Sequence, residues 1–245
     1  MRACAPTLLF TVCGRYNLKN AEALARLVAK LTGKPAEMGP PRYNVSPSQM
    51  NPVVKADADG KPEATTMRWG LVPAWDHSEK PKFAPINARS EEVLGKPTFK
   101  QAVQKRRCVI PADGFFEWLR PDEKTKIPYR IFLQDEAPFF IAGIFESEAS
   151  GRPETFALLT VGPNELMRPI HDRMPVIVDE PTALEWLKPG EMTDEHAKSI
   201  CVPYPADRMA AYQVSSIVNN ARNEVPECIV PVITSKTEPE EFKLE

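Results

Sequence analysis

The sequence predicts an α+β fold, with a single domain built on a curved, partly closed, barrel-like sheet of mixed or antiparallel strands and short flanking helices. Three observations predict it. The chain has 245 residues, 42% of them hydrophobic and 26% charged, which is enough to bury one sizeable core. Proline is frequent (26 residues) and glycine is scarce (11), a composition that favours many short elements joined by stiff turns. Strand-like and helix-like segments do not alternate regularly, which disfavours a doubly wound parallel sheet.

The elements can be assigned from local patterns. An amphipathic helix is expected at 21–31, where apolar residues recur at helical spacing and Gly33 follows. Shorter helices are expected at 99–106, 181–187 and 193–200. The expected strands are rich in β-branched and aromatic residues and have proline or glycine at their boundaries. These strands are 52–55, 64–69, 108–111, 129–133, 139–145, 155–161, 176–178 and 211–214.

Composition narrows the class of protein. No apolar run approaches the roughly 20 residues that a membrane-spanning helix needs, so we expect no membrane partner. The five cysteines are widely spaced, none forms a C-x-x-C pair, and there are three histidines. We therefore expect no metal, no cofactor and mostly reduced thiols, in a cytoplasmic, nucleoid-associated protein. A monomer is the default expectation.

The two ends of the chain are interpreted separately from the domain at 13–234. Residues 1–12 hold a short apolar stretch that fits an export signal poorly. We interpret them as a leader that is absent from the working protein, either removed by processing or the product of a misassigned start codon. Val12 fits the second case, because an internal GTG start is translated on paper as valine. Residues 235–245 are expected to form a disordered tail.

Four segments place polar residues among apolar ones and are candidates for chemistry. They are 13–16 (CGRY), 87–91 (NARSE), 112–118 (ADGFFEW) and 171–175 (HDRMP). Each segment alone also fits a structural role. An acid between aromatic residues, such as Glu117, is more often a satisfied structural group, and an asparagine after a proline-rich loop usually caps a turn.

Taken together and in this order, the four segments resemble the SRAP family, the SOS response-associated peptidases, which are also described as abasic-site processing proteins. The resemblance runs from Cys13 to about Pro231. Further matching blocks are 42–47 (RYNVSP), 68–75 (RWGLVPAW), 218–220 (VNN) and 226–229 (PECI).

The resemblance implies a function in the DNA damage (SOS) response. In this family an N-terminal cysteine captures the aldehyde of an abasic site in single-stranded DNA and forms a thiazolidine crosslink that shields the lesion. Here that cysteine would be Cys13, made terminal by autoproteolytic removal of the preceding residues. The implied enzyme combines lyase-like crosslinking with a self-processing peptidase activity. The implied partner is single-stranded DNA with abasic sites, and a preference for junctions with double-stranded DNA is left open.

The resemblance also implies roles for individual residues. Asn87 would orient the amine or a sugar oxygen, Glu117 would move protons, and His171 would promote opening of the sugar ring. Because Phe116 and Trp118 flank Glu117, we expect this carboxyl to be partly desolvated and its pKa to be raised. The implied DNA contacts are Arg15, Pro47, Trp75, Arg89, Ser90 and Arg173. Trp69 and Trp118 are expected in the core.

Three other functions remain open on the residues alone. A general cysteine peptidase would use Cys13, His171 and an acid. A second possibility is a noncovalent module that binds single-stranded DNA. A glycosidase would pair Asp113 with Glu117, because paired carboxylates perform that reaction, although Gly114 weakens the regular strand that this pairing needs.

Net charge bears on the DNA partner. The formal net charge of -2 argues against binding nucleic acid through bulk positive charge. However, residues 1–120 carry a net charge of +8 and residues 121–245 a net charge of -10. Such asymmetry between halves favours a local cationic surface around the candidate residues of the first half.

Overall fold

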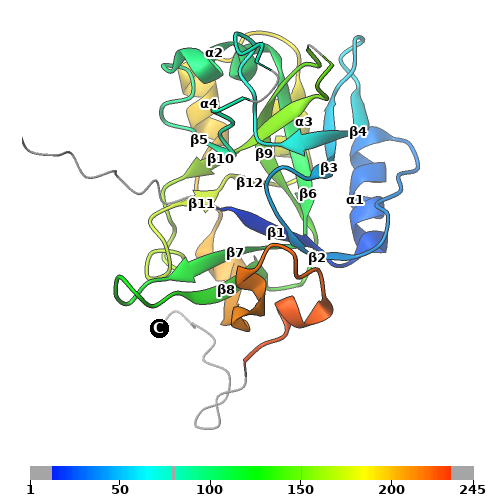
Figure 1. Ribbon diagram of the computed structural model, residues 1–245. Coiled ribbons are helices and arrows are strands. Elements are labelled where there is room, and N and C mark those ends of the chain that lie inside the picture. Colours follow the sequence, from blue (N-terminus) through cyan, green and yellow to red (C-terminus); the bar gives the residue numbers. More distant parts are fainter. Residues whose placement is uncertain (1–12, 79–80, 150, 233–245) are drawn as a thin grey trace, which may run out of the picture.

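The computed structural model describes residues 13–78, 81–149 and 151–232. The leader expected at 1–12 and the tail expected at 235–245 lie outside these residues. Within them, two β-sheets are surrounded by short helices (Figure 1), so the α+β prediction is confirmed.

The larger sheet is curved and has mixed strand directions. Its strands are β3 (Met50–Ala56), β4 (Pro62–Trp69), β5 (Asn87–Arg89), β6 (Arg107–Ala112), β9 (Phe139–Glu146), β10 (Thr155–Val161), β11 (Met174–Pro175) and β12 (Ile177–Val178). The order is β11-β10-β4-β3-β6-β9-β12, and β5 pairs in parallel with β10. Because β9 also pairs with β10, the strands form a ring, but this ring is not closed as a barrel. The predicted partly closed sheet is therefore confirmed.

The smaller sheet is antiparallel throughout. Its strands are β1 (Arg15–Leu18), β2 (Arg42–Val45), β7 (Gly114–Leu119), β8 (Ile127–Leu133) and β13 (Met209–Gln213), in the order β13-β8-β7-β1-β2. The register of β1 on β7 pairs Arg15 with Phe116 and Asn17 with Gly114. This register brings the start of β1 beside Glu117.

The helices follow from local sequence signals. They are α1 (Ala21–Thr32), α2 (Pro97–Lys105), α3 (Glu180–Leu187) and α4 (Asp194–Ile200), with 3-10 turns η1 (Ala206–Arg208), η2 (Ser216–Asn219) and η3 (Pro226–Ile229). In α1, the Asn20 side chain accepts a hydrogen bond from the Ala23 N–H, and Gly33 closes the helix with a φ of 68°. None of the helices in the described residues is long and apolar enough to cross a membrane.

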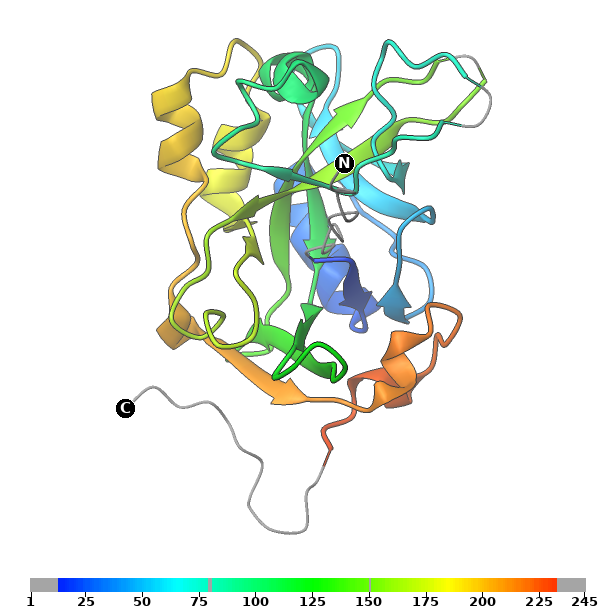
Figure 2. The ribbon, with the colours of Figure 1, turned by 60° about the vertical axis from the view of Figure 1, so that its left-hand side comes forward.

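Two apolar clusters lie on opposite faces of β7. Phe115 belongs to the main core, whereas Phe116 belongs to a second cluster with Val218 of η2 and Cys228 of η3. Figure 2 shows β13, η2 and η3, in orange and red, at the same end of the molecule as the β7–β8 hairpin. Because side chains alternate along a strand, Glu117 shares the inward face with Phe115. The acid therefore faces the interior between the sheets.

All four predicted helices and all eight predicted strands are present, with boundaries that shift by up to two residues. Strands β1, β2, β5, β7 and β11 are not among the strands expected from the sequence. Three of them carry candidate site residues, and their polar side chains interrupt the apolar alternation on which strand prediction depends.

Candidate active site

Cys13 lies at the entrance to β1 and is 1% exposed. Its main-chain N–H donates a hydrogen bond of 2.5 Å to Oε1 of Glu117, which lies on the neighbouring strand β7. Its φ is 46°, in the left-handed region that residues with a side chain rarely adopt. The pairing of β1 with β7 thus joins two residues that are 104 positions apart in sequence.

Glu117 is a buried acid with an unusual proton affinity. It is 1% exposed, and burial raises its pKa to about 7, while hydrogen bonds from Cys13 partly oppose this rise. The direction of the shift agrees with the prediction from sequence, but the predicted cause is wrong. Phe116 faces away from the acid, into the second cluster that Trp118 also contacts. The desolvation comes from the main core on the opposite face of β7.

His171 comes from the larger sheet, on the turn that precedes β11. Its Nε2 lies 4.0 Å from Oε2 of Glu117. Its Nδ1 lies 2.9 Å from Oδ1 of Asp172 and accepts a 3.1 Å hydrogen bond from the Arg173 N–H. Burial lowers the pKa of His171; the charge of Asp172 opposes this shift, and the charges of Arg120 and Arg173 add to it.

The Cys13 thiol is held in its protonated form. Burial, and next the negative charge of Glu117, raise its pKa well above the ordinary value, while the charge of Arg173 opposes them. A cysteine peptidase needs the reverse, a thiolate stabilised by a histidine. His171 is directed to Glu117 and Asp172, so this arrangement disfavours the general peptidase alternative.

Asn87 is the first residue of β5, opposite Leu158 of β10. The preceding residue, Ile86, lies against the chain next to Cys13, since a Cβ on Gly14 would be 3.8 Å from Ile86 Cδ1. The larger sheet therefore brings His171 to Glu117 and the start of β5 to the chain beside Cys13.

Asp113 does not pair with Glu117 as a glycosidase would require. Its carboxylate accepts hydrogen bonds from the main-chain N–H groups of Lys19 (3.1 Å) and Asn20 (2.7 Å), and from the side chain of Asn17. These bonds fix the connection between β1 and α1. Asp113 is therefore a structural acid, which disfavours the glycosidase alternative.

The predicted arginine contacts differ in their surroundings. Arg89 is 58% exposed and has one loose ion pair, 3.8 Å from Glu92. The guanidinium of Arg173 is 11% exposed and forms a forked pair with both oxygens of Glu91, at 2.8 and 2.7 Å. Their roles in binding DNA stay predictions, and Arg89 is the more accessible of the two.

Arg15 is held by the protein itself. It donates to Asn44 Oδ1 (2.8 Å) and to the carbonyls of Val218 (2.7 Å) and Asn219 (3.3 Å), and its guanidinium lies 6.0 Å from the centre of the Trp118 ring. These contacts join β1, β2, β7 and η2. Its predicted phosphate contact stays a prediction.

The remaining predicted contacts lie in loops or at strand ends. Trp75 is 63% exposed, as a base-stacking residue must be, and Pro47 lies in the turn between β2 and β3. The Ser90 N–H donates to the Thr160 carbonyl at 2.9 Å. Trp69 is buried as predicted, whereas Trp118 is half-buried and donates to Asn219 Oδ1 at 2.6 Å.

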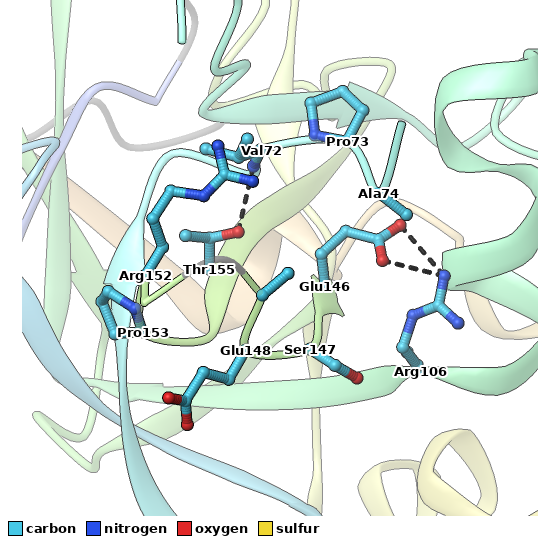
Figure 3. Close-up of a pocket in the computed structure, with 11 residues that line it drawn as sticks. Val72, Pro73, Ala74, Arg106, Glu146, Ser147, Glu148, Arg152, Pro153 and Thr155 are labelled. Atoms are coloured by element: carbon cyan, nitrogen blue, oxygen red, sulfur yellow. Dashed lines mark hydrogen bonds and ion pairs between the residues drawn. The ribbon is translucent and has the colours of Figure 1, made fainter. Parts of the chain in front are cut away.

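A separate cavity of about 180 Å³ lies between the loop after β4 and the β9–β10 hairpin (Figure 3). The ion pair of Arg106 with Glu146 lines it, and its lining contains none of the predicted site residues. In the described part of the chain, no group of three or more His, Cys, Asp or Glu residues could hold a metal ion.

Sequence reasoning missed two site residues. Asp172 contacts His171, and Glu91 holds Arg173, yet both were left without a role. Each stands next to an assigned residue in its segment, so their adjacency was the available signal. Adjacency alone does not reveal which way a side chain turns.

Comparisons with known proteins agree along most of the chain. A family model described as SOS response associated peptidase (SRAP) matches residues 12–221. The chain is 45% identical over 192 residues to the abasic site processing protein YoqW of Bacillus subtilis (strain 168), covering 77% of this chain and 85% of that protein. It is 35% identical over 226 residues to the abasic site processing protein HMCES of Gallus gallus, covering 78% of this chain and 66% of that protein.

Solved structures share the fold. A protein from Bacteroides thetaiotaomicron has a TM-score of 0.72 at 24% identity, covering 89% of this chain and 100% of that one. A phage-related protein from Bordetella bronchiseptica has a TM-score of 0.66 at 27% identity, covering 82% of this chain and 94% of that one. The two-sheet arrangement is therefore an established one.

Proposed function

The chain belongs to the SOS response associated peptidase (SRAP) family, and we propose that it processes abasic sites in DNA by capturing them covalently through Cys13. Relatives in Bacillus subtilis and Gallus gallus are named abasic site processing proteins. One observation carries the proposal. The main-chain nitrogen of a buried cysteine lies 2.5 Å from a buried carboxyl whose pKa is about 7. The proposed substrate is an abasic site in single-stranded DNA, bound by a monomer in the cytoplasm.

The proposed reaction needs a free α-amine on Cys13. The ring-opened abasic sugar carries an aldehyde at C1′, and an α-amine, with a reference pKa of about 8, is partly neutral at cytoplasmic pH. The amine adds to C1′, and loss of water gives an imine. The thiol sulfur then bonds to C1′ while the thiol proton passes to nitrogen. One aldehyde, one amine and one thiol become a five-membered thiazolidine and one water.

Glu117 is suited to move the protons of this sequence. A carboxyl with a pKa of about 7 is present in both forms near neutral pH. Its carboxylate can accept a proton from the amine of Cys13, and its acid form can protonate the departing hydroxyl of the carbinolamine. It can also accept the proton of the thiol, which the raised pKa keeps bound until the sulfur attacks.

We propose that the same carboxyl assists removal of the residues before Cys13. Hydrolysis of that peptide bond puts the hydroxyl of water on the preceding carbonyl carbon and a proton on the nitrogen of Cys13. Glu117 contacts this nitrogen and can supply the proton. Cleavage also frees Cys13 from its left-handed conformation, with a φ of 46°, which costs about 1–2 kcal/mol.

The test is a crosslinking assay with protein that starts at Cys13. This protein is mixed with a single-stranded oligonucleotide that carries one abasic site, and the products are separated on a denaturing gel. A DNA–protein band that disappears in Cys13→Ala is the expected result. Because serine retains the amine and an oxygen nucleophile, Cys13→Ser should give a weaker, less durable product.

The assay also separates the alternatives. A noncovalent binding module would shift the DNA on a native gel and leave no band under denaturing conditions, which would overturn the proposal. The full chain with residues 1–12 is the matched control for the free amine. It should crosslink only as fast as intact mass measurements show those residues being removed. A casein digestion assay, expected to show no cleavage, tests the general peptidase.

A further inference from the structure

The Nδ1 atom of His171 has two partners that need opposite protonation states. The Arg173 N–H donates to it at 3.1 Å, which requires Nδ1 to carry no proton. The carboxylate of Asp172 lies 2.9 Å from the same atom, and a hydrogen bond between them requires a proton on Nδ1. Nδ1 has one in-plane position for a proton or a lone pair, so the two bonds exclude each other.

The two bonds define two states of the ring. When Nδ1 accepts from Arg173, the neutral ring carries its proton on Nε2. When Nδ1 donates to Asp172, the ring is either the neutral Nδ1–H tautomer, whose Nε2 has no proton to give, or a cation with a second proton on Nε2, which faces Glu117 at 4.0 Å. Nε2 is a donor only in the form that accepts from Arg173 and in the cation. The cation is the stronger acid of the two.

The groups around the ring decide which state is favoured. Glu117 of β7 faces Nε2, Asp172 faces Nδ1, and the positive charges of Arg120 and Arg173 act on the ring from the end of β7 and from its own turn. Burial and the two arginines oppose the cation. The Asp172 side chain is 80% exposed, so this carboxylate is in contact with water and can exchange protons with it.

We propose that Asp172 is a positioning residue that holds the second proton on His171, so that Nε2 can act as the acid that opens the abasic sugar ring. This inference rests on the proposed function and extends it to a residue with no assigned role. In the step, Nε2 gives its proton to the ring oxygen O4′, which takes the electron pair of the C1′–O4′ bond. The C1′ hydroxyl gives its proton to the Glu117 carboxylate, and C1′ becomes the aldehyde carbon.

The first test measures the protonation of His171 directly and needs no DNA. The chain has three histidines, so the ring signals can be assigned by comparison with His171→Gln and titrated by nitrogen-detected NMR. In Asp172→Asn, the titration midpoint of His171 should fall by about half a pH unit, the size expected for an exposed ion pair. Asp194→Asn is the matched control, since it removes one carboxylate that pairs with Lys198 on α4, and it should leave the midpoint unchanged.

The second test measures the rate of crosslinking across pH. If the His171 cation supplies the acid, the rate falls as pH rises through the titration of the ring. Asp172→Asn should move this fall in rate to lower pH by about half a unit. At pH values above the titration midpoint of His171, the variant should therefore be about threefold slower than the parent. The Asp194→Asn profile should overlay that of the parent.

The outcomes separate the inference from the function on which it rests. An unchanged His171 midpoint in Asp172→Asn overturns the role of Asp172, whatever the DNA assay gives. A lowered midpoint with an unmoved rate profile overturns it as well, because the proton would then not be used in the reaction. If the parent forms no crosslink at all, the proposed function fails, while the NMR titration still reports on the contact between Asp172 and His171.

Discussion

Two buried acids lie in or directly before strand β7, and they have different roles. Asp113, just before the strand, accepts hydrogen bonds from two main-chain N–H groups and from Asn17. Glu117, within the strand, accepts hydrogen bonds from the main chain and the thiol of Cys13 and faces His171 at a distance of 4.0 Å. Burial is similar, at 1% exposed for both, so burial alone does not separate a structural acid from a chemical one.

The difference lies in the groups that each carboxylate meets. Three donors occupy Asp113 and hold the connection between β1 and α1 in place. Burial raises the pKa of both acids, but Glu117, whose pKa is raised to about 7, faces the nitrogen and thiol of Cys13 and the ring of His171, which can exchange protons with it. A buried acid becomes available for chemistry when the fold leaves its oxygens facing groups that react.

The rate of crosslinking should differ strongly between variants of the two acids. Glu117→Gln keeps the shape of the side chain but cannot exchange protons, so crosslinking should slow by about 10²–10⁴-fold. Asp113→Asn, four residues away, should change the rate by no more than a few fold in the folded protein. Single-turnover crosslinking with abasic single-stranded DNA measures both. Equal losses in the two variants would remove the distinction between them.

The pH dependence of stability should also distinguish Glu117. Because its folded pKa of about 7 lies above the ordinary value of 4.5, the folded protein binds more protons than the unfolded chain between these values. This group's contribution to stability is therefore present at pH 4.5 and is lost as pH rises through 7. Glu117→Gln should gain about 3 kcal/mol relative to the parent between pH 4.5 and pH 8, measured by urea unfolding. A difference between the two proteins that does not vary with pH would contradict the raised pKa.

The Asp113 end should respond in stability instead. Asp113→Asn places an amide donor against the N–H of Lys19 or Asn20, and it should cost about 2 kcal/mol. Gly114→Ala is a companion variant without a charge change, since its Cβ would lie 2.6 Å from Asn17 Oδ1. Both should lower the urea midpoint, and Asp113→Asn with parental stability would show that these bonds are not structural.

The smallest effect concerns two arginines that follow the same contrast. Arg89 is exposed, so Arg89→Ala should weaken DNA binding a few fold, reduce the salt slope by about one and leave the Tm unchanged. Arg15 is bound to the carbonyls of Val218 and Asn219, so Arg15→Ala should lower the Tm. Fluorescence anisotropy at several salt concentrations and thermal melts measure both variants. A salt slope unchanged in Arg89→Ala would exclude a phosphate contact.

The sequence predicted the elements that the core dictates. Helix α1 and strand β10 have strong periodic or continuous apolar patterns, and they were assigned to within one residue. Strands β1, β5 and β7 were missed because Arg15, Asn87 and Glu117 break that pattern. The polar residues that indicate a functional site also interrupt the hydrophobic periodicity from which strands are predicted, so the strands that carry the site are missed.

The amino-acid sequence is enough to predict the class of fold, the family and the four residue types that the chemistry needs: a cysteine, an asparagine, a glutamate and a histidine. It does not show which of the two acids contacts Cys13, because the register of β1 on β7 sets that contact. The cause of the raised pKa of Glu117 is also visible only in the tertiary structure. Phe116, its aromatic neighbour in sequence, faces the other side of the strand, and the main core buries the acid instead. The tertiary structure also places Asp172 against His171. Neighbours along a strand point to opposite faces, so the environment of a side chain is set by the elements packed against it.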